Sequence, residues 1–400
     1  MDTDWREDAS LEEALRGYVA KNMLRREILQ FMQRDYSSYA WSLRTLDRRL
    51  SHFDIKYINY DTPIQDIKDA VQKELDGVGK DYGYRAMNQV LRTRHNIQVP
   101  RNVVHTVMED LDPDGIERRN LQKKIKKPKG AFEADGPSSL VSLDGHDKLY
   151  GYQNYTFPVA IYGCLDTYSR KMHFLFVCKS NSDPQIIGRR YFDFLYETRK
   201  LPKFMRVDKG NETGKMAAMH TALSDWLDVL DDPVDSVIFG PSTSNKIERW
   251  WRELNEKMNP FFKDQLKTLL HTNEYDRHDN DHRDILAYVF IPIVQKQCDL
   301  FIEYWNSHRI RQQKDLHLPT GIPDHMFAFP EEYGGMDCGT LIPKNLLRDL
   351  SEQSGTLDVD LSIPFHSGRI KDICEGNLPN PEEVEPNDAI NMYRFLKTFV

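Results

Sequence analysis

The chain has 400 residues, of which 40% are hydrophobic and 29% are charged, and its formal net charge is -8. This composition is typical of a globular protein with two to four domains and excludes a largely disordered chain. We find no run of about 18 apolar residues to span a membrane, and the acidic, polar start differs from a secretory signal, so we expect an intracellular protein without a membrane partner.

The negative charge is concentrated near the carboxyl end. Residues 331–400 hold 13 Asp and Glu against 6 Lys and Arg, a net charge of -7, which leaves -1 of the total for residues 1–330. The overall charge therefore does not argue against nucleic acid as a partner of the remainder. We treat 331–400 as an acidic C-terminal region whose role its sequence does not indicate.

Apolar residues at helical spacing predict two helices within residues 24–53, with Ser42 as a candidate N-cap of the second. Arg44, Arg48 and Arg49 lie opposite the leucines of that helix, where a helix entering a DNA groove carries its basic residues. Any amphipathic helix has a charged outer face, so this pair of helices alone does not indicate DNA.

A second helical unit follows. Residues 67–75 predict one helix, and residues 83–91 and 100–108 predict two more, packed across a short turn as in a helix-turn-helix. The exposed face of the last helix would carry side chains suited to bases and phosphates, namely Arg101, Asn102, His105 and Thr106. Two such units in tandem predict a DNA-binding region over residues 1–115.

A basic linker is predicted over residues 116–136. Its Lys123, Lys124, Lys126 and Lys127 are candidates for contacts with DNA phosphates, and the run also resembles a nuclear-import signal. A solvated linker without a partner explains the same composition equally well.

From Ser139 the pattern changes to alternating strands and helices. Residues 157–165 and 172–178 predict two strands joined as an antiparallel hairpin. A helix at 184–199, a strand ending at Asp208, a helix carrying Leu223, a strand at 236–239 and a helix over 243–258 follow. This order predicts an α/β chain in which residues 137–259 form a ribonuclease-H-like mixed sheet flanked by helices.

Three carboxylates mark the ends of these elements. Asp144 follows an apolar run and precedes a glycine, and Asp208 repeats this arrangement. Glu248 lies in the first turns of the last helix, where helical phase places it with Asn245 and Arg252 in a polar stripe beside the apolar one. We therefore expect Glu248 near the sheet ends, close to the two aspartates.

Converging carboxylates repel one another unless cations neutralise them. Oxygen ligands favour Mg²⁺, with Mn²⁺ as the alternative, and two ions about 3.5–4 Å apart suit phosphoryl transfer. We expect Asp144 to bridge both ions, Asp208 to bind one and Glu248 the other. Lys209, Asn245 and Arg252 are candidates to hold phosphate or to orient the carboxylates.

Residues 260–330 predict a helical extension whose longest apolar stretch covers 285–305. His271, His278, His282 and Cys298 lie in this region and suggest zinc, but their spacing matches no zinc finger. The chain's five cysteines also lack the close spacing of a disulfide framework.

Residues 137–259 resemble an integrase core domain, the DDE catalytic domain of retroviral integrases and related transposases. The resemblance rests on Asp144, Asp208 and Glu248, with 63 and 39 residues between them, and on Ser242 and Asn245 before the glutamate. Over residues 25–330 the chain is similar to a group of eukaryotic integrase-core proteins, with the shared features Gly83-Tyr84-Arg85, Leu111-Asp112-Pro113-Asp114-Gly115, Asp144-Gly145, Lys148-Leu149, Asp166, Ser169-Arg170, Asp208-Lys209-Gly210, Ile247-Glu248-Arg249 and Trp305-Asn306.

This resemblance implies metal-dependent cleavage and transfer of DNA strands, with Asp144, Asp208 and Glu248 as the metal ligands. The carboxylate spacings exceed those of retroviral integrases, and helix-turn-helix units stand in place of their zinc domain. We interpret the chain as a transposon-derived protein. We expect it to act on DNA as a homo-oligomer, without a small-molecule substrate, in the nucleus and secondarily in the cytoplasm.

Three functions stay open at this point. The intact carboxylate set favours an active DDE integrase or transposase, a nucleotidyltransferase. The tandem helix-turn-helix units and the acidic region favour a host-adopted DNA-binding protein whose core is silent. A nuclease or RNA–DNA hybrid hydrolase on the same fold differs from the first in using only water, and not a 3′-hydroxyl, as nucleophile.

Overall fold

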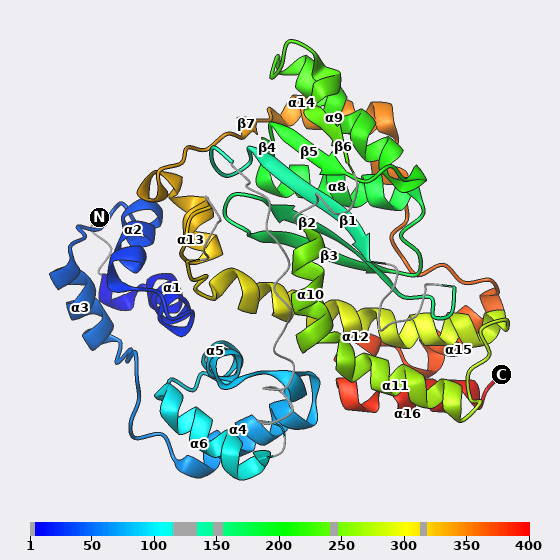
Figure 1. The fold of residues 1–400 in the computed structure, drawn as a ribbon, viewed down its shortest axis with the longest axis horizontal. Helices are drawn as coiled ribbons and strands as arrows, with labels where there is room; N and C mark the ends of the chain where they lie inside the picture. Colours follow the sequence, from blue (N-terminus) through cyan, green and yellow to red (C-terminus); the bar gives the residue numbers. More distant parts are fainter. Residues whose placement is uncertain (1–4, 114, 116–133, 147–154, 241–246, 313–317) are drawn as a thin grey trace. The chain divides into compact units, whose positions relative to one another are not determined.

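The structure is a computed structural model that describes the chain except residues 1–4, 114, 116–133, 147–154, 241–246 and 313–317 (Figure 1). It divides into two compact units. The first comprises Met1–Lys129, Asn306–Arg311 and Gly321–His325, and the second comprises Gly130–Trp305, Gln312–Thr320 and Met326–Val400.

The first unit is helical. Its helices are α1 (Ala9–Ala20), α2 (Arg25–Asp35), α3 (Leu43–His52), α4 (Ile64–Asp76), α5 (Tyr84–Arg94) and α6 (Arg101–Leu111). Helix α1 was not predicted, because only Leu11, Leu15 and Val19 are apolar and buried in an otherwise polar stretch. Their spacing of four residues places them on one face of the helix.

Helix α3 confirms one prediction and corrects another. Ser42 caps the helix, since its hydroxyl accepts a hydrogen bond from Thr45 N at 3.2 Å. Arg49 does not face outward, because it is only 3% exposed and its guanidinium lies 4.0 Å from the centre of the Trp41 ring. Two further rings, Trp5 and Tyr39, lie within 5.3 Å of the same guanidinium and help to bury it.

Helices α5 and α6 pack across a fixed turn. The buried Asn88 side chain donates to Val99 O at 3.0 Å, and Ile97 N donates to Leu91 O at 2.9 Å. Helix α6 buries Val104, Val107 and Met108 and exposes Arg101, Asn102 and Thr106. This division of faces agrees with the sequence analysis, and a helix-turn-helix role stays a prediction.

The second unit contains a five-stranded mixed sheet, so the α/β fold class is confirmed. Its strand order is β3-β2-β1-β5-β6, with β1 (Leu140–His146), β2 (Ala160–Asp166), β3 (Met172–Cys178), β5 (Phe204–Val207) and β6 (Val237–Phe239). Strands β1, β2 and β3 are antiparallel, whereas β5 runs parallel to β1 and to β6. The expected hairpin is therefore present, and β3 has the predicted bounds.

Helices cover both faces of this sheet. On one face α8 (Pro184–Thr198), α9 (Gly214–Trp226) and α14 (Lys344–Ser354) form the main core with β1 and β5. On the other face α10 (Ile247–Lys257) approaches β1 and β2, and α11 (Asn259–His271) follows it (Figure 1). This arrangement is consistent with a ribonuclease-H-like core.

Helix α12 (Asn280–Ser307) runs beside β3 (Figure 1). The side-chain amide of Gln295 donates to Leu175 O and accepts from Val177 N, both at 2.8 Å. By length and composition α12 could cross a membrane, which corrects the expectation that no such stretch exists. Two thirds of its most apolar window is buried in the structure, and core helices of soluble proteins meet the same criterion.

The acidic C-terminal region is folded onto the second unit. After α13 (Pro323–Ala328), β7 (Thr340–Leu341) pairs with β4 (Lys200–Leu201), and α14 contributes Leu347 and Leu350 to the core. Helices α15 (Gly368–Asn377) and α16 (Ala389–Lys397) complete the unit. Arg394 of α16 binds Glu274 in two hydrogen bonds of 2.5 and 2.8 Å.

Asp166 joins the start of β1 to the β2–β3 turn. This fully buried carboxylate accepts hydrogen bonds from Ser138 N and Ser169 N at 2.8 Å and from Ser169 Oγ at 2.6 Å. The turn is also fixed by Trp305, whose indole donates to Arg170 O at 2.7 Å. These features of the family resemblance therefore have structural roles here.

Burial raises the pKa of Asp166 to about 6, although its hydrogen bonds oppose the shift. Above the unfolded value of about 3.9, the folded state retains a proton that the unfolded chain releases. The contribution of protonated Asp166 to the stability of the fold is complete below that value and is lost as the pH rises through about 6. Relative to Asp166→Asn, we expect wild type to lose roughly 2–3 kcal/mol of unfolding free energy between pH 4 and 7, measured by urea titration.

The exposed Asp372→Asn variant serves as a control and should follow the wild-type curve. Parallel pH dependence of wild type and Asp166→Asn would contradict a raised pKa at Asp166.

Candidate active site

Two of the predicted carboxylates lie near the ends of two paired strands. Strands β1 and β5 are parallel, with Val141 beside Met205 and Ser142 beside Arg206. Asp144 and Asp208 lie two residues beyond the last of these pairs, so a continuation of the same register would bring them about 5 Å apart. Asp208 directly follows β5, whereas β1 continues for two residues beyond Asp144.

The buried Tyr162 is affected by the negative charge of the carboxylates near the ends of β1 and β5. Burial raises the pKa of Tyr162 well above its usual value, and the charges of Asp144, Glu212 and Asp208 raise it further. The three carboxylates therefore lie near one phenol. Glu212 was not predicted, because it comes from a 3-10 turn, Asn211–Thr213, that has no periodic signal.

Glu212 folds back over the turn that carries Asp208. A Cβ atom at Gly210 would lie 2.1 Å from Glu212 Oε1, so a side chain at this position would displace the carboxylate from its present place. The signal that could have identified it is its position four residues after Asp208 and two residues after Gly210.

Asp208 has an oxygen suited to a cation. Its Oδ1 atom is buried and has no hydrogen-bond partner among the residues that the structure describes. Burial raises the pKa of this carboxyl group. A buried oxygen without a donor is stabilised by a proton or by a cation, so the residue fits a hard metal ion.

Asp144 is oriented by helix α10. The indole of Trp251 donates to Asp144 Oδ2 at 2.9 Å, and the same ring stacks on His146 with centroids 5.1 Å apart. His146 Nε2 lies 3.2 Å from Asn255 Oδ1. These contacts attach the middle of α10 to the last residues of β1.

Gly163 allows α10 to approach the sheet. Gly163 of β2 pairs with Asp144, and a Cβ atom here would lie 2.9 Å from Trp251 and 3.1 Å from Ile247. Glu248 follows Ile247 in α10, so its backbone lies over the same part of the sheet. The side chain of Glu248 lies outside the described residues, and its predicted convergence with the aspartates stays a prediction.

The other predicted site residues fall into three groups. In the second unit, Lys209 is exposed after Asp208, and Arg252 is exposed on α10. In the first unit, the exposed residues are Arg44 and Arg48 on α3 and Arg101 and Asn102 on α6. Asn245 and the linker residues Lys123, Lys124, Lys126 and Lys127 lie outside the described residues.

The histidines and cysteine that suggested zinc do not gather. Cys298 and His282 lie on α12 about 24 Å apart along the helix axis, at a rise of about 1.5 Å per residue. Within the described parts of the chain, no group of three His, Cys, Asp or Glu is placed to hold a metal ion.

Comparison with known families agrees with this geometry. A family model described as "Integrase core domain" matches residues 131–325. The chain contains an integrase core domain. This domain belongs to the ribonuclease-H-like superfamily, and such domains bind DNA and generally use divalent metals. No curated protein matches the chain.

Gly163→Ala tests the close approach of α10. The added methyl group would lie within 3.1 Å of three side chains, those of Trp251, Leu175 and Ile247, so we expect a loss of about 1–3 kcal/mol in unfolding free energy, measured with urea.

Gly376→Ala in α15 is the matched control, since nothing lies within 4 Å of a Cβ there. It should be neutral or stabilise by up to about 1 kcal/mol. Equal stability of the two variants would contradict the tight packing at Gly163.

Proposed function

We propose that this integrase core domain is a DDE-type enzyme that cleaves and joins DNA strands by two-metal phosphoryl transfer. The observation that supports the proposal is the parallel register of β1 and β5, whose last pair, Ser142 and Arg206, lies two residues before Asp144 and Asp208. The unpaired Oδ1 atom of Asp208 and the family match support it.

Asp144 and Asp208 would hold the metal, and Glu248 would supply the third carboxylate from α10. Mg²⁺ is the proposed ion, with Mn²⁺ as the alternative, because the ligands are carboxylate oxygens. When bound, two such ions activate a water or a 3′-hydroxyl and stabilise the leaving oxygen. Trp251 fixes the orientation of the Asp144 carboxylate through its indole N–H.

Exposed basic residues would position the DNA. Lys209 lies directly after Asp208, and Arg252 lies one residue after Trp251, so both are close in sequence to groups of the site. In the first unit, Arg101 and Asn102 at the start of α6 would contact DNA as a recognition helix does. The homo-oligomer and the nuclear location are parts of this proposal.

A catalytically silent DNA-binding protein is the second candidate. The exposed polar face of α6 favours it, because that face needs none of the carboxylates for binding.

A hydrolase that accepts only water as nucleophile would use the same carboxylates as the proposed enzyme. The products of a reaction that offers a free 3′-hydroxyl end distinguish these two enzymes.

Asp144→Asn and Asp208→Asn test the catalytic proposal. With Mg²⁺ or Mn²⁺ and labelled DNA, we expect strand cleavage or joining by wild type and a loss of at least about 100-fold in each variant. Changes to groups that only support metal ligands already cost about 10–100-fold.

The exposed Asp225→Asn variant on α9 is the control and should retain the activity. Calorimetric titration of Mn²⁺ supplies a second measurement and should show weaker binding in both site variants. Wild-type protein without any cleavage or joining would favour the silent DNA-binding protein.

Arg101→Gln tests the role of α6. Loss of one phosphate contact should weaken binding to duplex DNA and reduce the slope of log K against log salt by about 0.9. Fluorescence anisotropy at several salt concentrations measures both quantities.

Lys73→Gln, on an exposed position of α4, removes an equal charge from the same unit and should leave both values unchanged. If the two variants behave alike, α6 is not the recognition helix.

A further inference from the structure

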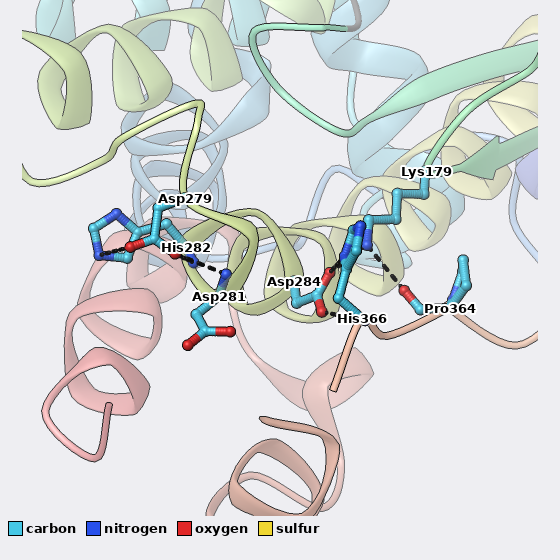
Figure 2. Close-up of polar contacts among 7 residues, drawn as sticks. All are labelled: Lys179, Asp279, Asp281, His282, Asp284, Pro364 and His366. Atoms are coloured by element: carbon cyan, nitrogen blue, oxygen red, sulfur yellow. Dashed lines mark hydrogen bonds and ion pairs between the residues drawn. The ribbon is translucent and has the colours of Figure 1, made fainter. Parts of the chain in front are cut away.

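A second polar cluster lies outside the carboxylate site. Figure 2 shows the fully buried Asp284 of α12 between Lys179, which follows β3, and His366, which precedes α15. Asp284 accepts hydrogen bonds from the Lys179 ammonium group, from His366 N at 2.7 Å and from His366 Nδ1 at 3.0 Å. Lys179 also donates to Pro364 O at 2.9 Å.

These bonds fix three distant segments to one another. Burial alone would raise the pKa of Asp284, but hydrogen bonds from Lys179 and His366 lower it below its usual value. The carboxylate is therefore ionised at neutral pH and holds both donors. Because Asp284 engages His366 Nδ1, the other ring nitrogen is directed away from this carboxylate.

A cavity of about 480 Å³ opens beside the cluster. Its lining consists of Tyr155, Lys179, Ser180, Arg283, Pro364, Phe365 and His366. This described lining contains two cations and a histidine. Asp284 lies directly behind it and is paired with Lys179, so Arg283 gives the lining its net positive charge. Asp279 and His282 pair with each other on the other side of the first turn of α12 (Figure 2). The cavity is therefore suited to an anion that is larger than a simple ion.

An aromatic ring stands at the rim of this cavity. Tyr155 is 59% exposed, and the Arg277 guanidinium lies 5.7 Å from the centre of its ring. Arg283 donates to Tyr155 O at 2.8 Å and fixes the backbone of the same residue. An exposed ring supported by arginines beside a basic groove is how proteins bind single-stranded nucleic acid.

The cavity and the carboxylate site lie at the same end of the sheet, where β1 and β3 both terminate. The last residue of β3, Cys178, pairs with Ala160, while the last residue of β1, His146, pairs with Ile161. The loop that begins at Lys179 also reaches β1, since Asn181 occupies the space that a Cβ atom at Gly145 would need.

The separation of the two sites suits one nucleic-acid strand. Asp144, Gly163 and Leu175 are aligned across three strands, and Lys179 lies four residues beyond Leu175. At about 3.3 Å per residue and 4.8 Å per strand, Asp144 and Lys179 are roughly 15 Å apart. A strand that advances about 3.4 Å per nucleotide covers this distance in a few nucleotides.

We propose that this cavity binds single-stranded DNA, with a phosphate held by Lys179 and Arg283 and a base stacked on Tyr155. The identification of the ligand as DNA rests on the proposed function. The cavity would hold the strand a few nucleotides from the position at which it is cut or joined.

Binding of a labelled 12-nucleotide DNA to the full-length chain, in EDTA so that no cleavage occurs, tests this proposal. Tyr155→Ala combined with Arg283→Gln should raise Kd at least ten-fold, and Tyr155→Phe should restore stacking. Tyr196→Ala combined with Arg348→Gln alters an exposed tyrosine and an exposed arginine elsewhere in the second unit and should leave Kd unchanged.

Photo-cross-linking locates the base even if the first unit also binds DNA. With a 5-bromouracil oligonucleotide, wild type should be cross-linked at the peptide that contains Tyr155. The label should disappear in Tyr155→Ala and persist in Tyr196→Ala. An oligonucleotide with abasic positions should bind as weakly to wild type as the intact one binds to Tyr155→Ala.

An unchanged Kd in the double variant, together with a cross-link elsewhere in the chain, would overturn the proposal. The test is independent of catalysis. If Asp144→Asn binds and cross-links like wild type while no protein cleaves DNA, the cavity proposal stands and the catalytic proposal fails.

Discussion

The site depends on the parallel pairing of β1 with β5 at the centre of the sheet. A continuation of this pairing would bring Asp144 beside Asp208, and a slip of one residue would turn one of the carboxylates to the opposite face. The surrounding structure protects the register. Asp166 fixes the start of β1, and Val141, Leu143, Met205 and Val207 anchor both strands in the core beneath α8 and α9. The positions of the two carboxylates therefore depend on apolar core residues that take no part in the proposed chemistry.

Helix α10 is attached to the sheet beside Asp144. The helix can approach only because Gly163 has no side chain, and Trp251 uses this space to reach Asp144. The indole thus has two roles, since it packs as an apolar body and donates one directed hydrogen bond. Any change that moves Trp251 would disturb the orientation of Asp144 and the placement of Glu248 together.

Periodicity predicted the order of elements and even the bounds of β3, because alternating burial in strands and one buried face in helices are local patterns. It also singled out Asp144 and Asp208, which follow the paired segments of β1 and β5, and their joint role stays a prediction. Periodicity could not predict features that arise from contacts between residues far apart in the sequence. Three aromatic rings bury Arg49, a 3-10 turn positions Glu212, and Asp284 joins residues that are about one hundred positions away on either side. Helix α1 was missed because few apolar residues sufficed to bury its face.

The amide of Gln295 has a consequence for assembly. By accepting from Val177 N and donating to Leu175 O, it imitates the peptide group of a neighbouring strand and satisfies the outer edge of β3. An unsatisfied edge would invite another chain to add a strand, which is a common route to aggregation. Because α12 occupies this edge, copies of the domain cannot join sheet to sheet there. The opposite edge, β6, has only three residues, which leaves little backbone for an added strand to pair with.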